Sequence, residues 1–317
     1  MRPLLATALL LASLPARGWF WEGADPTPKT KSLYAAGKYN EVVAALSPES
    51  LQKLNRDRLQ QAYFYLGLSY ERMGRLTEAL STYQIATKLF PKNINLLSEL
   101  GGILHQVGLN EQAQPIFEKV LSIHPNNERA HLGLAEIERQ LGLLDESSDH
   151  YERTLEINAE QAPVWRDYAE VLLAMRDTKT AELAIQKSLS LSADNEATID
   201  LAFIERAQGR LDDAIDTLEL ARKAQPGRDD IALTMGLWLL EAGRPHQARD
   251  LAAARLKADP SDPLALWISA RESLSEGRMA DAVRSLRGAA GAARRAPFIA
   301  KAAAALLVEL QGTSGGL

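Results

Sequence analysis

The chain has 317 residues, of which 46% are hydrophobic and 24% are charged, and this composition excludes widespread disorder. Its formal net charge of −5 provides no overall basic surface that could neutralise nucleic-acid phosphates, so we expect no nucleic-acid partner. Cysteine is absent, which excludes disulfides, thiolate metal sites and thiol catalysis.

The first 18 residues are organised like a secretory signal peptide. Arg2 supplies positive charge, Leu4–Leu14 is an apolar run of 11 residues, and small residues lead to a predicted cleavage after Gly18. A membrane-spanning helix needs roughly 20 apolar residues. We therefore expect a periplasmic or secreted protein with no stable membrane span after cleavage; the alternative is an uncleaved N-terminal anchor. Residues 19–30 are predicted as an extended arm whose aromatic residues cover the first repeat or dock a partner.

An internal repeat occupies most of the remaining chain. Three columns of small residues keep the same spacings, 34, 34, 34, 33, 34 and 34 residues, across seven units. One column includes Ala79 and another includes Gly67. The column that opens the motif contains Gly74, Gly108, Gly142, Arg176, Gly209, Gly243 and Gly277.

Each unit is predicted to form two amphipathic helices. Apolar residues recur at helical spacing on both sides of Gly74, which is expected to end the first helix because glycine adopts the left-handed conformation without a Cβ clash. Small residues at Gly67 and Ala79 are expected to let the paired helices approach closely. The second helices of four units are expected to be closed by Pro91, Pro125, Pro226 and Pro260.

The repeat resembles the tetratricopeptide repeat (TPR) superfamily. Its pattern occurs as Tyr63-x2-Leu66-Gly67-x2-Tyr70, followed by Ala79-x3-Tyr83 and Pro91. The resemblance implies an all-α fold, a right-handed α-solenoid of about seven to eight TPR helix-turn-helix units with a C-terminal capping helix.

The boundaries follow from the repeat register. A degenerate first repeat and connector, residues 31–59, precedes the seven units, and a capping helix at 297–310 and a flexible tail at 311–317 follow them. Arg176 replaces a turn glycine, and Ala159 and Ala193 replace closing prolines, so less standard turns are expected there, either as tolerated variation or as a hinge or partner seam. The seven units are 60–93, 94–127, 128–161, 162–194, 195–228, 229–262 and 263–296.

The resemblance also implies a concave groove, lined by the first helices, that binds a protein or peptide partner. Apolar members of this face could instead pack one first helix against the next. Reversing the charges of Arg139 and Arg166 is expected to weaken partner binding without affecting folding. The candidate groove residues are Phe64, Leu68, Glu71, Arg129, Leu132, Glu136, Arg139, Arg166, Glu170, Phe203, Arg206, Leu237, Trp267 and Arg271.

No residue pattern indicates catalysis. The histidines have no metal-ligand spacing and are predicted to be surface residues. There is no phosphate-binding loop, dinucleotide fingerprint or nucleophile elbow. We therefore expect no enzymatic activity, no cofactor, no catalytic residues and no metal site.

The predicted function is that of a non-catalytic scaffold for protein–protein interactions in the bacterial cell envelope, in an assembly or secretion complex. The compartment follows from the signal peptide, and the bacterial assignment rests on the resemblance and on an alanine- and arginine-rich composition. Two alternatives stay open: a periplasmic chaperone that holds extended or unfolded polypeptides, and a regulatory subunit of an envelope enzyme.

Overall fold

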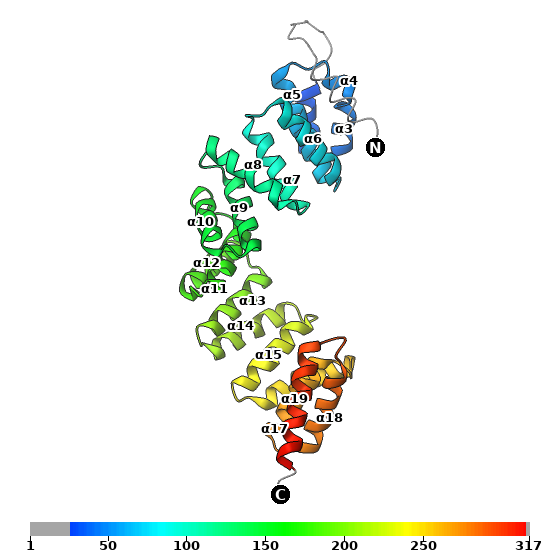
Figure 1. Cartoon of the computed structure of the whole chain (residues 1–317), viewed down its shortest axis with the longest axis vertical. Helices are drawn as coiled ribbons and strands as arrows, with labels where there is room; N and C mark the ends of the chain where they lie inside the picture. The colour runs from blue at the N-terminus through cyan, green and yellow to red at the C-terminus, as the bar shows by residue number, and fades with distance from the viewer. Residues whose placement is uncertain (1–25, 315–317) are drawn as a thin grey trace. The chain divides into compact units, whose positions relative to one another are not determined.

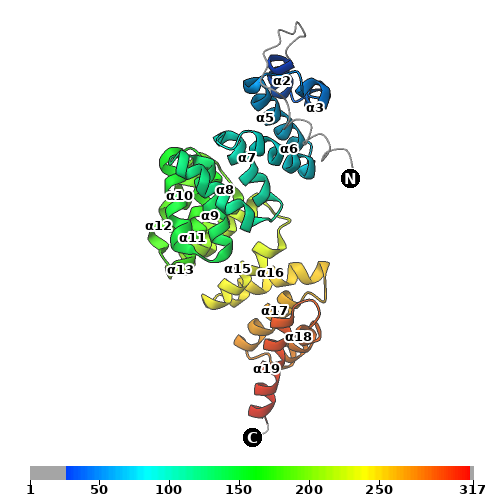
Figure 2. The same cartoon turned by 45° about the horizontal axis from the view of Figure 1, so that its top comes forward.

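The computed structural model describes residues 26–314 and divides the chain into two compact units, residues 1–159 and 160–317 (Figures 1 and 2). The described residues form helices joined by short turns, without a strand. None of the described helices is both long enough and apolar enough to span a bilayer. The predicted signal peptide and the cleavage after Gly18 lie outside the described residues.

From residue 26 onward, unit 1 consists of one short N-terminal helix group followed by three helix pairs. The pairs are α5 with α6, α7 with α8, and α9 with α10, and α2 and α3 pack on α5. In chain order the helices are α2 (Pro26–Ala35), α3 (Tyr39–Ala45), α4 (Pro48–Leu51), α5 (Arg56–Arg72), α6 (Leu76–Leu89), α7 (Ile94–Gln106), α8 (Asn110–Ile123), α9 (Glu128–Leu141) and α10 (Leu144–Ile157).

Unit 2 continues with four helix pairs and a final helix. Figure 1 draws that helix, α19, in red beside α17 and α18, on which it packs. The helices are α11 (Ala162–Ala174), α12 (Thr178–Leu191), α13 (Asn195–Ala207), α14 (Leu211–Ala224), α15 (Asp229–Glu241), α16 (Pro245–Ala258), α17 (Pro263–Ser275), α18 (Met279–Gly291) and α19 (Pro297–Ser314). The predicted all-α class and the stacked helix pairs are confirmed.

Three helix ends differ from the sequence prediction. The arm expected at residues 19–30 overlaps α2, which begins at Pro26, because proline is compatible with the first turn of a helix. The first regular unit begins earlier than residue 60, since Asn55 caps α5 by accepting a hydrogen bond from the Arg58 N–H at 3.0 Å. The capping helix continues past residue 310, so residues 311–314 belong to α19 and not to a tail.

Close packing within unit 1 depends on glycines that face aromatic rings. Phe117 of α8 is buried between Gly101 of α7 and Gly133 of α9. A Cβ atom would lie 2.6 Å from this ring at residue 101 and 2.3 Å from it at residue 133. A Cβ atom added at Gly67 would overlap the buried ring of Tyr83 in the same way. The expectation that Gly67 lets the paired helices approach is therefore confirmed.

The turn glycines have the conformation that the sequence predicts. Gly74 has φ +71°, and its N–H donates to the Glu71 carbonyl at 2.9 Å while the Arg75 N–H donates to the Tyr70 carbonyl at 2.8 Å. These two bonds form the left-handed C-terminal motif of a helix. The same positive φ recurs at each of the other turn glycines of the repeat.

We expect Gly243→Val to lower the free energy of unfolding by about 1–3 kcal/mol, because a β-branched residue is strained at the φ of +71° found there. No atom lies within 4 Å of an added Cβ, so the loss is conformational and not steric. Thermal unfolding followed by circular dichroism measures it. An unchanged melting curve would contradict the strained turn.

Arg176 forms the same turn without glycine. Its φ is +66°, its N–H donates to Leu173 at 3.0 Å, and the Asp177 N–H donates to Leu172 at 2.9 Å. The helices before Ala159 and Ala193 also end in the usual register, at Ile157 and Leu191, without a proline. The less standard turns expected at these residues are therefore not found, except that the connection between α12 and α13 is one residue shorter than its counterparts.

We expect Arg176→Gly to raise the free energy of unfolding by about 1 kcal/mol, because a residue with a side chain costs about 1–2 kcal/mol in the left-handed region and glycine does not. The greater freedom of glycine in the unfolded chain offsets part of the gain. Urea unfolding of the two proteins checks the sign. A decrease in stability would show that the Arg176 side chain stabilises the turn.

The starts of the helices differ between the two units. In unit 1, the first helices of the three pairs begin with asparagine caps at Asn55, Asn93 and Asn127. In unit 2, the side-chain caps are aspartates, which accept N–H bonds at the starts of α12, α13 and α17. They are Asp177, Asp194 and Asp262.

Candidate partner-binding site

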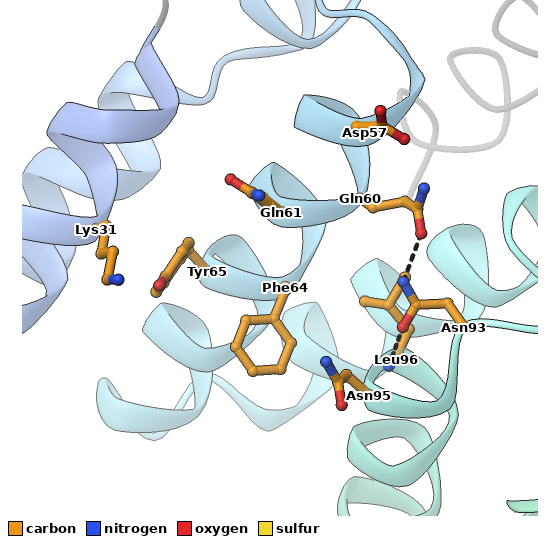
Figure 3. Close-up of a pocket in the computed structure, with 9 residues that line it drawn as sticks. All are labelled: Lys31, Asp57, Gln60, Gln61, Phe64, Tyr65, Asn93, Asn95 and Leu96. Carbon is orange, nitrogen blue, oxygen red and sulfur yellow. Dashed lines mark hydrogen bonds between the residues drawn. The ribbon is translucent and has the colours of Figure 1, made fainter.

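A cavity of about 460 Å³ in unit 1 is lined by residues of α2, α5 and the start of α7 (Figure 3). Phe64 and Tyr65 form its aromatic part, with ring centroids 5.6 Å apart. Figure 3 shows the Phe64 ring with Tyr65 on one side and Asn95 on the other. The lining residues are Lys31, Asp57, Gln60, Gln61, Phe64, Tyr65, Asn93, Asn95 and Leu96.

Amide side chains dominate the polar part of this cavity. Asn93 caps α7 by accepting a bond from the Leu96 N–H at 3.1 Å, and its Nδ2 donates to Gln60 Oε1 at 2.6 Å. These bonds tie the start of α7 to α5. Each of the other two amides, Gln61 and Asn95, carries donors and an acceptor and is exposed. The cavity can therefore pair with the N–H and C=O groups of a bound chain while Phe64 contacts an apolar side chain.

Two of the predicted charged residues of unit 1, Arg129 and Glu136, are paired within the unit. Arg129 Nη2 lies 2.8 Å from Glu99 Oε2, over Gly102, where a Cβ would come within 2.5 Å of the guanidinium. Burial raises the pKa of Glu99 to about 7, although Arg129 favours the charged form. His105 Nε2 lies 3.0 Å from Glu136 Oε2, and this hydrogen bond raises the pKa of His105. Arg129 and Glu136 are thus held by partners on α7.

The remaining predicted groove residues of unit 1 are only partly accessible. Leu68, Glu71, Leu132 and Arg139 are half-buried along α5 and α9. Glu71 lies close enough to Tyr83 to contribute, after burial, to the raised pKa of that phenol. Phe64 is the predicted residue of unit 1 that lines the cavity.

In unit 2, Arg166 is surrounded by carboxylates. Its Nε lies 2.9 Å from Asp200 Oδ2, and other guanidinium nitrogens lie 3.6 Å from Glu170 Oε1 and from Asp194 Oδ2. Burial raises the pKa of Asp200 to about 6, and Arg166 opposes this rise. Arg166 and Glu170 therefore belong to one half-buried charge cluster that links α11 to α13.

We expect Arg166→Glu to destabilise the protein by about 1–3 kcal/mol at pH 8, since it leaves three carboxylates facing a fourth. We therefore expect this change to affect folding, whereas the sequence analysis predicts that it does not. The loss should shrink at pH 5, where Asp200, with a pKa of about 6, is protonated. Chemical unfolding at both pH values measures it, with exposed Arg284→Glu as the control. Equal losses in the two variants would contradict a structural role for Arg166.

The last predicted residues of unit 2 lie together on α13, α15 and α17. Phe203 packs edge-on against Trp238 with centroids 5.1 Å apart, and Arg206 Nη2 lies 2.7 Å from Glu241 Oε2. A second cavity, of about 340 Å³, is lined by Leu237, Leu240, Glu241, Trp267 and Arg271. Three of the five lining residues were predicted for the groove.

Sequence reasoning missed several residues of these sites. Gln61 and Asn95 occupy the same position of their units as the predicted groove residue Arg129, so the repeat register could have found them. Lys31 lies before the regular repeats, so the repeat spacing could not predict that it lines the cavity. His131 is buried, 9% exposed, and its Nδ1 lies 2.9 Å from His150 Nδ1, so the prediction of a surface residue is wrong for His131. Across the described residues, no three His, Asp or Glu side chains could hold a metal ion together.

Comparison with known proteins identifies the repeats. Family models described as tetratricopeptide repeat match residues 60–93, 104–166, 167–229 and 233–298. Protein FlbA of Caulobacter vibrioides is 24% identical over 218 residues, which are 67% of this chain and 37% of FlbA. The chain spans 16% to 39% of the length of the curated relatives that it matches.

Solved structures share the fold. A tetratricopeptide repeat protein from Parabacteroides merdae superposes with a TM-score of 0.55 at 17% identity, covering 78% of this chain and 98% of that protein. YrrB, described as a TPR protein with an unusual peptide-binding site, superposes with a TM-score of 0.52 at 19% identity, covering 58% of this chain and 95% of YrrB.

Proposed function

Because this chain belongs to the tetratricopeptide repeat family, whose members mediate protein–protein interactions, we propose that it is a non-catalytic scaffold that binds an extended segment of a partner protein in unit 1. The cavity between α2, α5 and α7 carries this proposal. It combines an aromatic surface with amide side chains and has room, at about 460 Å³, for one or two residues of a bound chain.

The chemistry of the cavity favours a backbone over a strongly charged ligand. Gln61 and Asn95 can each donate to a carbonyl and accept from an N–H group, which an extended peptide presents in alternation. Phe64 supplies the apolar contact. Lys31 and Asp57 bring opposite charges, so the cavity has no excess of either sign.

The proposed place of action is the bacterial cell envelope, in an assembly or secretion complex. This part of the proposal rests on the sequence of residues 1–18, with its charged start, apolar run and small residues before Trp19. After export the scaffold would be periplasmic or secreted.

Photocrosslinking tests both parts of the proposal. A photoreactive amino acid replaces Asn95 in the full chain, which is expressed with its own N-terminus in a Gram-negative host and recovered from the envelope fraction. The matched control carries the same amino acid at Gln84, an exposed residue of the second helix α6. Mass spectrometry identifies the adducts, and N-terminal sequencing identifies the first residue.

The proposal expects one dominant adduct from residue 95, none from residue 84, and Trp19 as the first residue. Equal adducts from the two residues would overturn the cavity as the binding site. Many unrelated adducts from residue 95 would indicate a chaperone that holds varied polypeptides. An intact Met1 with partners from the cytoplasm would remove the envelope assignment and leave the binding function standing.

A further inference from the structure

The cavity between α15 and α17 in unit 2 is a second candidate site, and its chemistry differs from that of the unit 1 cavity. Leu237, Leu240 and Trp267 give it an apolar interior, and Glu241 and Arg271 line it as well. Its volume of about 340 Å³ suits one large side chain. None of its described lining residues carries an amide side chain.

The arginines around this cavity are held in different ways. The Arg206 guanidinium lies over the Trp238 ring, 5.3 Å from its centroid, and pairs with Glu241 at 2.7 Å. The Arg271 guanidinium lies over the Trp267 ring at 5.8 Å. Within the described residues, no carboxylate lies within ion-pair distance of Arg271. Arg271 therefore presents a positive charge at an apolar cavity, held over an aromatic ring.

Other arginines on or beside the first helices of unit 2 are already neutralised. Arg166 faces Asp200, Glu170 and Asp194, and Arg228 pairs with Glu196 and with Asp230. Since Glu241 is neutralised by Arg206, the cavity carries one net positive charge, that of Arg271. An acidic ligand complements this charge and a basic ligand does not.

We propose that this cavity binds a partner segment in which a large apolar side chain lies beside an acidic side chain. The apolar side chain enters between Leu237 and Trp267, and the carboxylate pairs with the Arg271 guanidinium. This is a second binding site, and its test does not depend on the cavity of unit 1.

Short synthetic peptides test the proposal on the full chain. The probe is an acetylated, amidated seven-residue peptide with a central Phe and a Glu two residues to either side, because residues two apart lie on one side of an extended chain. The matched probes carry Gln or Lys in place of Glu. Titrations followed at the Trp267 indole N–H resonance give the dissociation constants.

The wild-type protein should bind the Glu peptide about five times more tightly than the Gln peptide. Arg271→Gln should bind the two equally, and Arg271→Glu should prefer the Lys peptide. Arg287→Glu, at an exposed residue of α18, changes the net charge equally and should keep the wild-type preference.

Three outcomes would overturn the proposal: no shift of the Trp267 resonance with any peptide, a Glu preference that survives Arg271→Gln, or loss of that preference in Arg287→Glu. Arg271 is exposed, so its variants are expected to fold. An Asn95→Ala variant separates the two proposals, because it should weaken the proposed function in unit 1 and leave these peptide affinities unchanged.

Discussion

Gly133→Ala is expected to lower the free energy of unfolding by about 2–3 kcal/mol, at the upper end of the usual cost of overpacking a core. The new Cβ would lie 2.3 Å from two atoms of the Phe117 ring. The ring cannot move away, because it is buried and its opposite side faces Gly101, where a Cβ would lie 2.6 Å from it. The helices α8 and α9 must therefore separate or the ring must leave its preferred rotamer.

Three further variants make this prediction specific: Gly227→Ala, Phe117→Leu and the double variant with Gly133→Ala. Gly227→Ala places a methyl group where no atom lies within 4 Å, so its stability should stay within about 0.5 kcal/mol of the parent. Phe117→Leu combined with Gly133→Ala should be less destabilised than the sum of the two single changes, because the smaller side chain makes room. Urea unfolding followed by circular dichroism measures the parent, the three single variants and the double variant. Additive losses would mean that the methyl group and the ring do not meet.

Glu138→Gln is expected to raise the free energy of unfolding by about 2 kcal/mol at pH 8 and to change it little at pH 4.5. Burial raises the pKa of the Glu138 carboxyl to about 7, and the nearby Glu146, Glu118 and Asp149 raise it further. Its Oε1 lies 3.7 Å from Nε2 of His150, whose own pKa is lowered by burial and by His131. Glutamine removes the cost of a buried charge.

The sign follows from the protons bound in each state. Between pH 4.5 and 7 the folded state keeps the Glu138 proton while the unfolded state releases it, so raising the pH across this window destabilises the wild type. Above pH 7 the full cost is present. The Glu138→Gln variant lacks this pH-dependent loss of stability. The difference in free energy of unfolding between the variant and the wild type should therefore grow from pH 4.5 to pH 8. Glu152→Gln, at an exposed residue of α10, is the control, and parallel pH profiles for Glu138→Gln and the wild type would contradict the prediction.

The fold was largely predictable because backbone conformation sets the repeat pattern. A left-handed turn favours glycine at one position of each unit, and a close helix crossing favours a small residue at another, so both leave a periodic signal. Arg176 shows the limit of this reasoning, since its turn keeps the left-handed φ without glycine. Helices α2 and α19 lie outside the regular repeats, so the start of α2 and the end of α19 were predicted less accurately.

The candidate sites were less predictable, because side-chain partners depend on how neighbouring helices are rotated against each other. The groove pattern placed Phe64 and Trp267 beside cavities. It could not show that Arg166 is surrounded by carboxylates while Arg271 has no carboxylate within ion-pair distance among residues 26–314. Nor could it place Lys31, which reaches the first cavity from a helix outside the regular repeats.

The N-terminal caps of the helices respond differently to acid in the two units. An asparagine cap has no proton to gain, so Asn55, Asn93 and Asn127 keep accepting their N–H bonds when the medium is acidified. An aspartate cap becomes a weaker acceptor once it is protonated, and it also loses the favourable interaction of its charge with the helix dipole. Strong acid would therefore leave the first-helix caps of unit 1 intact and weaken the Asp177 cap of α12, although the hydrogen bonds from Thr180 lower the pKa of Asp177 and so keep this cap charged further into acid.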